Sequence, residues 1–338
     1  MEIKIIRPRN KAEKSGTGTD ERAGNLSPNK ALTFLSGTDK RRERSGNGDK
    51  TLSREAYENE KLAEIVGELD DLIGLRSVKT LVREIKAFIE IQRIRQQEHL
   101  VSEPPVLHMI FKGNPGTGKT TVARIMGKLF REINVLSKGH LVEIERADLV
   151  GEYIGHTAQK TREQLKKSYG GILFIDEAYA LARGGEKDFG KEAIDTLVKA
   201  MEDQKDNLIL ILAGYKKEMD DFIKSNPGLK SRFPIYIVFP DYSIKELLQI
   251  ADLMLKRRQY APSPGAREAL KRILELKTGK GHEHSGNARL VRNIIEKAMR
   301  RQAVRLVELS DLTRDDLMLI IEEDIEEARE LCLKNALL

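Results

Sequence analysis

The sequence has little of what marks secreted and membrane proteins. It holds one cysteine, Cys332, in 338 residues, which excludes an internal disulfide framework. No stretch approaches the ~20 consecutive apolar residues of a membrane span, and the first residues lack the apolar core of a signal peptide. Hydrophobic residues still make up 40% of the chain, enough for a sizeable core. We therefore expect a soluble, cytoplasmic protein.

The main part of the chain also lacks a strong charge of either sign. The net charge is +6, but residues 1–50 hold 12 Lys/Arg and 7 Asp/Glu and so account for +5 of it. This segment is rich in Gly, Ser, Asn and Lys and poor in aromatic residues, which is typical of disorder. We predict a disordered basic leader over residues 1–52. Its run Lys40–Arg44 leaves a contact with nucleic acid or an acidic partner open, although a solvated leader is the simpler interpretation.

Apolar runs and amphipathic helical patterns alternate as far as residue 240. The runs predict strands at 106–112, 140–146, 171–176, 208–214 and 235–239, and the periodic segments predict helices at 119–133, 157–169, 190–204 and 216–224. Such alternation predicts an α/β domain over residues 53–240, a parallel sheet with helices on both faces. Residues 243–338 show only helical periodicity, which predicts a smaller all-helical domain over residues 241–338, beside the first.

A phosphate-binding loop follows the first predicted strand. Residues 113–120 read GNPGTGKT, the pattern G-x-x-x-x-G-K-[ST] of a P-loop. Its glycines let the backbone N–H groups curl around an anion, with a helix N-terminus behind it. Lys119 is predicted to reach the β- and γ-phosphates, and the Thr120 hydroxyl to ligate Mg²⁺. The sequence therefore predicts an ATP site built from Gly113, Asn114, Pro115, Gly116, Thr117, Gly118, Lys119, Thr120 and Thr121.

Two carboxylates end the third predicted strand. The run from Gly171 to Ile175 is continuously apolar, as in a buried central strand, and Asp176 and Glu177 follow it. The carboxyl ends of such strands face the nucleotide crevice of a doubly wound sheet. Asp176 is therefore expected in the metal shell, and Glu177 is expected to orient and deprotonate the attacking water. Together with the loop, these residues predict ATP hydrolysis.

The order of these segments resembles the AAA+ ATPase family over about residues 60–310. The resemblance implies a P-loop NTPase sheet with a helical lid domain. It also implies a homo-oligomeric ring, a hexamer, in which hydrolysis drives work on another macromolecule. Ile73 and Gly74 match the family's segment that borders the adenine base.

Two further segments resemble parts of the family that act between molecules. Tyr153, Ile154 and Gly155 resemble the pore loop with which protein-remodelling members grip an extended polypeptide, since an aromatic ring makes sequence-tolerant apolar contact. The alternative is a packed tyrosine at a helix entry. Arg232 resembles the arginine finger, which stabilises charge on the γ-phosphoryl group of a neighbouring subunit. Its alternative is a surface salt bridge.

The resemblance also implies sensors of the γ-phosphate. Arg289 matches the second sensor, at the start of a lid helix, and Arg292, one turn later, is the second choice. The alternative for Arg289 is a pair with a surface carboxylate. The first sensor is usually a small polar residue, but here the strand ends in Ala213, Gly214 and Tyr215. Either the Tyr215 hydroxyl orients the water, or this role has moved elsewhere.

Three segments, 151–158, 212–215 and 286–289, narrow the resemblance to the subgroup of stage V sporulation protein K and red-type RuBisCO activases. The basic leader favours the sporulation type. We therefore expect a motor that remodels an as yet unidentified protein. Two alternatives remain, a nucleic-acid motor or loader and a nucleotide-gated switch that binds partners without pulling. Tyr153 favours a peptide, because a nucleic-acid motor would usually place Lys or Arg there.

Overall fold

The computed structural model describes residues 60–102, 105–153, 155–184, 188–278 and 286–334. The basic leader predicted at 1–52 lies outside these ranges, as does Ile154. The described chain begins with a helix over residues 60–70, followed by the longer helix α2 (Arg76–Gln97). Within the described residues, none of the helices combines the length and the apolarity that crossing a membrane requires.

A parallel sheet forms the centre of the first domain, with strand order β2-β3-β4-β1-β5. Every strand lies within the range predicted for it, and the bounds are β1 Met109–Lys112, β2 Leu141–Ile144, β3 Gly171–Ile175, β4 Leu208–Gly214 and β5 Ile235–Val238. Parallel strands need long crossovers. The helices that supply them are α3 (Lys119–Glu132), α5 (His156–Ser168), α6 (Gly190–Asp203) and α7 (Lys216–Ser225). The predicted parallel α/β fold is confirmed.

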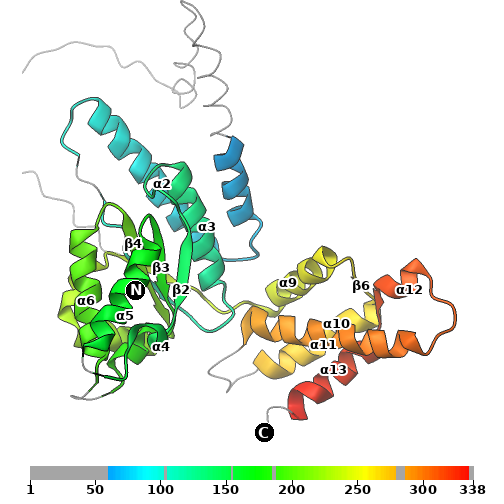
Figure 1. Ribbon diagram of the computed structural model, residues 1–338. Helices are drawn as coiled ribbons and strands as arrows, with labels where there is room; N and C mark the ends of the chain where they lie inside the picture. The colour runs from blue at the N-terminus through cyan, green and yellow to red at the C-terminus, as the bar shows by residue number, and fades with distance from the viewer. Residues whose placement is uncertain (1–59, 103–104, 154, 185–187, 279–285, 335–338) are drawn as a thin grey trace, which may run out of the picture. The chain divides into compact units, whose positions relative to one another are not determined.

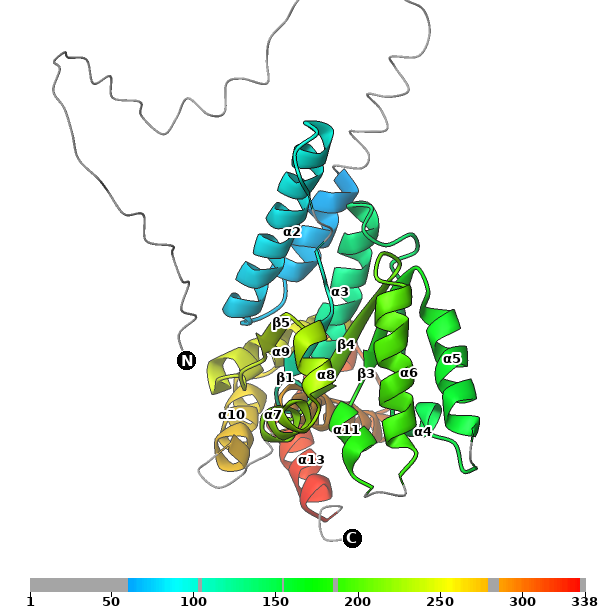
Figure 2. The same cartoon turned by 90° about the vertical axis from the view of Figure 1, so that its left-hand side faces the viewer.

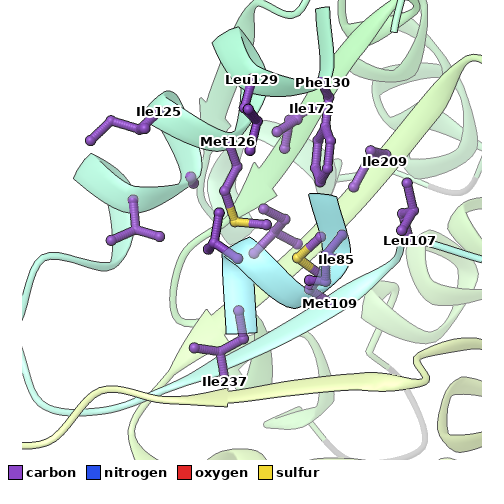
Figure 3. Packing of buried hydrophobic residues seen from close by; sticks show 14 of the residues in the cluster. Ile85, Leu107, Met109, Ile125, Met126, Leu129, Phe130, Ile172, Ile209 and Ile237 are labelled. Carbon is purple, nitrogen blue, oxygen red and sulfur yellow. The ribbon is translucent and has the colours of Figure 1, made fainter. Parts of the chain in front are cut away.

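Alternate side chains of the buried strands enter two different cores. In β4, Ile209 and Ile211 pack with α2 and α3, whereas Leu210 and Leu212 pack with α5, α6 and α7 on the other face. This is the period of two that a strand imposes on its side chains. Figures 1 and 2 show the two helical layers on either side of the sheet. Figure 3 shows the first core, where side chains of α2 and α3 meet those of the strands: Ile85, Met126, Phe130, Met109 and Ile172.

Short helices that the periodicity did not predict complete this domain. They are α4 (Arg146–Leu149), the 3₁₀ helix η2 (Ala178–Ala182) and α8 (Pro227–Arg232). Each is too short to show a helical repeat in the sequence.

The remaining residues form the predicted helical lid around a core of its own. Its helices are α9 (Ile244–Arg257), α10 (Pro264–Thr278), α11 (Asn287–Val307), α12 (Arg314–Met318) and α13 (Glu322–Lys334). A capping box starts α9: Ser243 Oγ accepts from the backbone N–H of Glu246, whose carboxylate accepts from the N–H of Ser243. The sequence did not predict one detail, the parallel pairing of β6 (Ala261–Pro262) with β7 (Leu319–Ile320), because two-residue strands leave no period.

A buried histidine makes the stability of the first domain depend on pH. His108 is 4% exposed, and its Nδ1 accepts a hydrogen bond of 3.1 Å from the backbone N–H of Leu210. Burial lowers the pKa of His108 from 6.5 to about 4. The unfolded chain therefore binds this proton first as the pH falls, so neutral His108 stabilises the fold fully above pH 6.5 and loses that contribution between 6.5 and 4.

We predict that His108→Gln weakens the dependence of stability on pH in this window. The wild-type contribution lost across it is at most about 3 kcal/mol. Melting temperatures measured at several pH values would show the effect. His156→Gln, at an exposed histidine, is the control and should leave the pH profile unchanged. Parallel profiles for wild type and His108→Gln would contradict the prediction.

Candidate nucleotide site

The loop between β1 and α3 is held by its own side chains. Lys119 Nζ donates to the carbonyl oxygens of Gly113 and Asn114, at 2.9 Å each, and Thr117 Oγ1 donates to the Asn114 oxygen at 2.8 Å. Gly116 and Gly118 have φ of 72° and 94°, in the region that favours glycine. Lys119 is 9% exposed, and burial lowers the pKa of its ammonium group, against the opposing effect of the carboxylates Asp176, Glu177 and Asp241.

The predicted carboxylates follow β3 at the same edge of the sheet. Glu177 has φ of 46°, an uncommon value for a residue with a side chain, and its backbone N–H donates to Asp176 Oδ1 at 3.0 Å. Backbone strain of this kind is typical of functional sites. Burial and the neighbouring Glu177 carboxylate, with which Tyr179 also hydrogen-bonds, raise the pKa of the Tyr179 hydroxyl.

A pocket of about 440 Å³ joins the loop, the carboxylates and the lid. Its lining is polar and includes most of the residues that we predicted to contact nucleotide and metal: Gly113, Pro115, Gly116, Gly118, Lys119, Thr120, Thr121, Asp176, Glu177, Tyr215, Arg289 and Arg292. Within the described chain, four of the residues predicted to contact nucleotide lie outside this lining: Ile73, Gly74, Asn114 and Thr117. Ile73 packs against the lid core, and Gly74 lies beside Glu246 and Tyr242.

Two acids of β2 and its end also line the pocket, and the sequence analysis missed them. Glu143 accepts a hydrogen bond of 3.2 Å from the Thr120 hydroxyl, and Glu145 lies beyond it. The signal was present, because an acid at the carboxyl end of a parallel strand is what identified Asp176. The oxygen donors of Thr120 and Asp176 share the pocket with these acids, and oxygen is the ligand that Mg²⁺ prefers.

The first turn of α11 closes the pocket from the lid side. Arg289 and Arg292 both line it, so the structure brings together the first and second choices for this sensor. The N–H of Ala288 donates to the Gly116 carbonyl at 3.2 Å. A Cβ atom on Gly116 would lie 2.7 Å from the backbone nitrogen of Arg289, so only glycine fits between the loop and the lid at this position.

Comparison with known proteins agrees with this geometry. Residues 109–241 match the family model of the ATPases associated with various cellular activities (AAA), and residues 243–334 match the AAA lid domain. The chain belongs to the AAA family of ATPases. It is therefore an ATP-hydrolysing enzyme, as predicted.

Three curated relatives place the chain more finely. Stage V sporulation protein K of Bacillus subtilis is 57% identical over 265 residues, covering 78% of this chain and 82% of that protein. Protein CbbX of Cereibacter sphaeroides is 48% identical over 280 residues, covering 82% and 90%. The chloroplastic ribulose bisphosphate carboxylase/oxygenase activase of Cyanidioschyzon merolae is 46% identical over 277 residues, covering 81% and 94%. These are the two types in the subgroup that the sequence predicted.

A solved structure supports the fold alone. A mutant of RuvB from Thermotoga maritima aligns with a TM-score of 0.51 at 19% identity, covering 78% of this chain and 72% of that one.

Tyr215, the first residue after β4, lines the pocket described above. Burial and the Glu177 carboxylate raise the pKa of its hydroxyl, and its ring centroid is 6.1 Å from that of Tyr179. The hydroxyl is thus close enough to Glu177 for the two groups to interact electrostatically, which is compatible with a role in placing the water.

Arg232 lies away from the pocket lining of its own chain. It is the last residue of α8, its Nε donates to Glu202 Oε1 at 3.1 Å, and its NH1 donates to the Gly228 carbonyl at 2.8 Å. The structure therefore shows the salt bridge that we named as the alternative. Glu202 is 60% exposed in this pair, so its net stabilisation is at most about 1 kcal/mol, and a stronger partner can displace it.

Tyr153 is 66% exposed and stands just before α5. Its ring makes an edge contact with His156, with centroids 5.4 Å apart. This exposure excludes the alternative of a tyrosine packed in the core.

Proposed function

We propose that this ATPase assembles as a homo-hexameric ring in the cytoplasm and uses hydrolysis to remodel a protein substrate during sporulation. A nucleotide domain over residues 53–240 and a lid over 241–338 would form each subunit. The observation that supports the gripping role is the 66% exposure of Tyr153. Its aromatic ring does not pack in the core and is free to contact a polypeptide. The higher identity to the sporulation protein, 57% against 46–48% for the activase-type relatives, supports the pathway.

Five residues of the pocket have a proposed role at the phosphates. Lys119 would leave the loop carbonyls to contact the β- and γ-phosphates. Thr120 and Asp176 would hold Mg²⁺, which when bound neutralises phosphate charge. Glu177 would take the proton of the attacking water, and Tyr215 would help to orient that water.

Two arginines would respond to the γ-phosphate from opposite sides. Arg289 approaches from the lid of the same chain, since it already lines the pocket. Arg232 would enter from the neighbouring subunit, exchanging Glu202 for the transferring phosphoryl group. A ring of subunits is the assembly in which every Arg232 finds such a site.

The gripping role predicts that Tyr153→Ala separates hydrolysis from work. Because Tyr153 lies outside the pocket lining, basal ATPase activity should stay within a few-fold of wild type, while stimulation by substrate is lost. Truncation of an exposed ring should change stability by no more than about 0.5 kcal/mol. Tyr153→Phe keeps the ring and is the matched control. It should behave as wild type in both assays.

The substrate for this assay would be obtained with the hydrolysis-deficient Glu177→Gln protein, which should hold it in the presence of ATP. Capture of a carboxylase instead of a protein made during spore formation would contradict the pathway. Stimulation by DNA or RNA, unchanged in Tyr153→Ala, would contradict the gripping role and favour a nucleic-acid motor.

A further inference from the structure

The first residue of α11 is buried and has an unusual backbone conformation. Asn287 is 1% exposed and has φ of 45°, a region that asparagine tolerates better than most residues. Its side-chain oxygen accepts from the N–H of Tyr242 at 3.0 Å. Its amide nitrogen donates to Asp241 Oδ1 at 2.8 Å and to the Pro115 carbonyl at 3.3 Å. One side chain thus joins the lid helix, the junction between the domains and the phosphate loop.

Asp241 is the centre of this network. It is the last residue of the AAA match, and the lid match begins two residues later, at 243. Its carboxylate accepts from the side-chain amide of Asn114, at 3.0 and 2.9 Å, as well as from that of Asn287. Asn114 of the phosphate loop and Asn287 of the lid donate to the same carboxylate, so Asp241 connects the loop to the lid.

Three consecutive carbonyls of the phosphate loop accept hydrogen bonds from this side. Pro115 accepts from Asn287, Gly116 accepts from the N–H of Ala288 at 3.2 Å, and Thr117 accepts from the Tyr242 hydroxyl at 3.2 Å. All three donors come from residues after 240. The lid and its junction therefore bind the loop at residues 115–117.

The direction of these carbonyls fixes the direction of the N–H groups. In a trans peptide the C=O of one residue and the N–H of the next point in opposite directions, and the described chain has no cis bonds. Carbonyls of residues 115–117 that point at the lid thus turn the N–H groups of residues 116–118 the other way. N–H groups that converge in such a loop form the nest that binds phosphate oxygens.

We propose that Asn287, acting through Asp241 and the loop carbonyls, is a positioning residue that orients the phosphate-binding N–H groups and couples the lid to phosphate binding. This inference rests on the proposed nucleotide site. It also makes the coupling reciprocal, because a lid that orders the nest must be held more tightly when phosphate occupies it.

Exchanging the amide of Asn287 and the carboxylate of Asp241 tests the network. Asn287→Asp removes the donor and places a second carboxylate against Asp241, so affinity for a fluorescent ADP analogue should fall about tenfold, the value of one or two hydrogen bonds. Asp241→Asn keeps an acceptor oxygen for both asparagines and should change affinity by no more than a few-fold. In the double variant the new amide at position 241 can donate to the new carboxylate at position 287, so the part of the affinity that depends on this bond should return. The bond to the Pro115 carbonyl stays broken.

The controls separate positioning from a loss of folding. Asn293→Asp changes an exposed asparagine of the same helix and should leave affinity unchanged. Asn287→Gly keeps the left-handed backbone while removing the side-chain hydrogen bonds. It should lose affinity as well, so the proposal stays testable if Asn287→Asp folds poorly. Melting temperatures measured without nucleotide report on folding independently.

The outcomes distinguish this proposal from the site on which it rests. Normal affinity in Asn287→Asp, or a double variant as weak as Asn287→Asp while both melt normally, would overturn the positioning role. Unchanged affinity in Lys119→Ala would instead overturn the nucleotide site.

Discussion

Glu177→Gln should bind ATP as tightly as wild type and turn it over about 10²–10⁴-fold more slowly, the usual contribution of a general base. The amide keeps the size of the side chain and the φ of 46° at this position but cannot accept the proton of the water. Lys119→Ala should show the opposite defect. Its buried ammonium group is the one proposed to contact the β- and γ-phosphates, so affinity should fall about a hundredfold.

Isothermal titration with ATP and a phosphate-release assay separate the two effects. Lys128→Ala is the matched control for the lysine, since Lys128 lies on the same helix but pairs with Glu68 at the surface. It should bind and hydrolyse ATP normally. Equal affinities in wild type and Lys119→Ala, or normal turnover in Glu177→Gln, would show that this pocket does not do the chemistry.

Arg232→Ala should lower turnover about 10³-fold or more while leaving nucleotide affinity near that of wild type. An arginine finger stabilises charge that develops only in the transition state. Lys230→Ala, two residues earlier on α8 and exposed, removes a similar charge from the same surface and should have little effect. Glu202→Gln removes the partner of Arg232 in its own chain, and it should not reduce turnover if Arg232 works in a neighbouring site.

Mixing two inactive variants tests where Arg232 works. A subunit with Glu177→Gln supplies a normal Arg232, and a subunit with Arg232→Ala supplies a normal Glu177. If the finger acts on a neighbour, mixed assemblies should recover part of the activity that each variant alone lacks. No recovery at any mixing ratio would argue against a finger supplied by another subunit.

The fold and the chemical groups of the site were predictable because their signals are local. Lys119 and Asp176 stand at fixed distances from their strands in the sequence, and parallel strands bring their carboxyl ends to one edge. The alternation of apolar runs with amphipathic helical patterns likewise predicted a parallel sheet with helices on both faces. In each case a short stretch of sequence carries the whole constraint.

The contacts between loop and lid were not predictable in this way. Asn287 meets Pro115 across 172 positions, and Asn114 meets Asp241 across 127. An asparagine at the start of a helix reads as an ordinary cap, and nothing nearby shows that its amide is buried against another domain. Such pairings depend on how the lid packs on the sheet domain, which no periodicity records.

Arg232 shows a second kind of limit. Its sequence context resembles a finger, yet within the single chain it binds Glu202. On our proposal, the phosphoryl group that would displace this carboxylate belongs to another subunit. The structure of a single chain therefore cannot test a role that Arg232 would have only in an assembly.

Turnover at a site shared between subunits makes the specific activity depend on protein concentration. The measurement is the ATPase rate per subunit at saturating ATP over a range of protein concentrations. Light scattering shows the concentration at which the assembly forms, and the range should extend from well below it to well above it. We expect the rate per subunit to rise with assembly and then level off. A rate per subunit that stays constant while the chain passes from monomer to ring would contradict a motor built from shared sites.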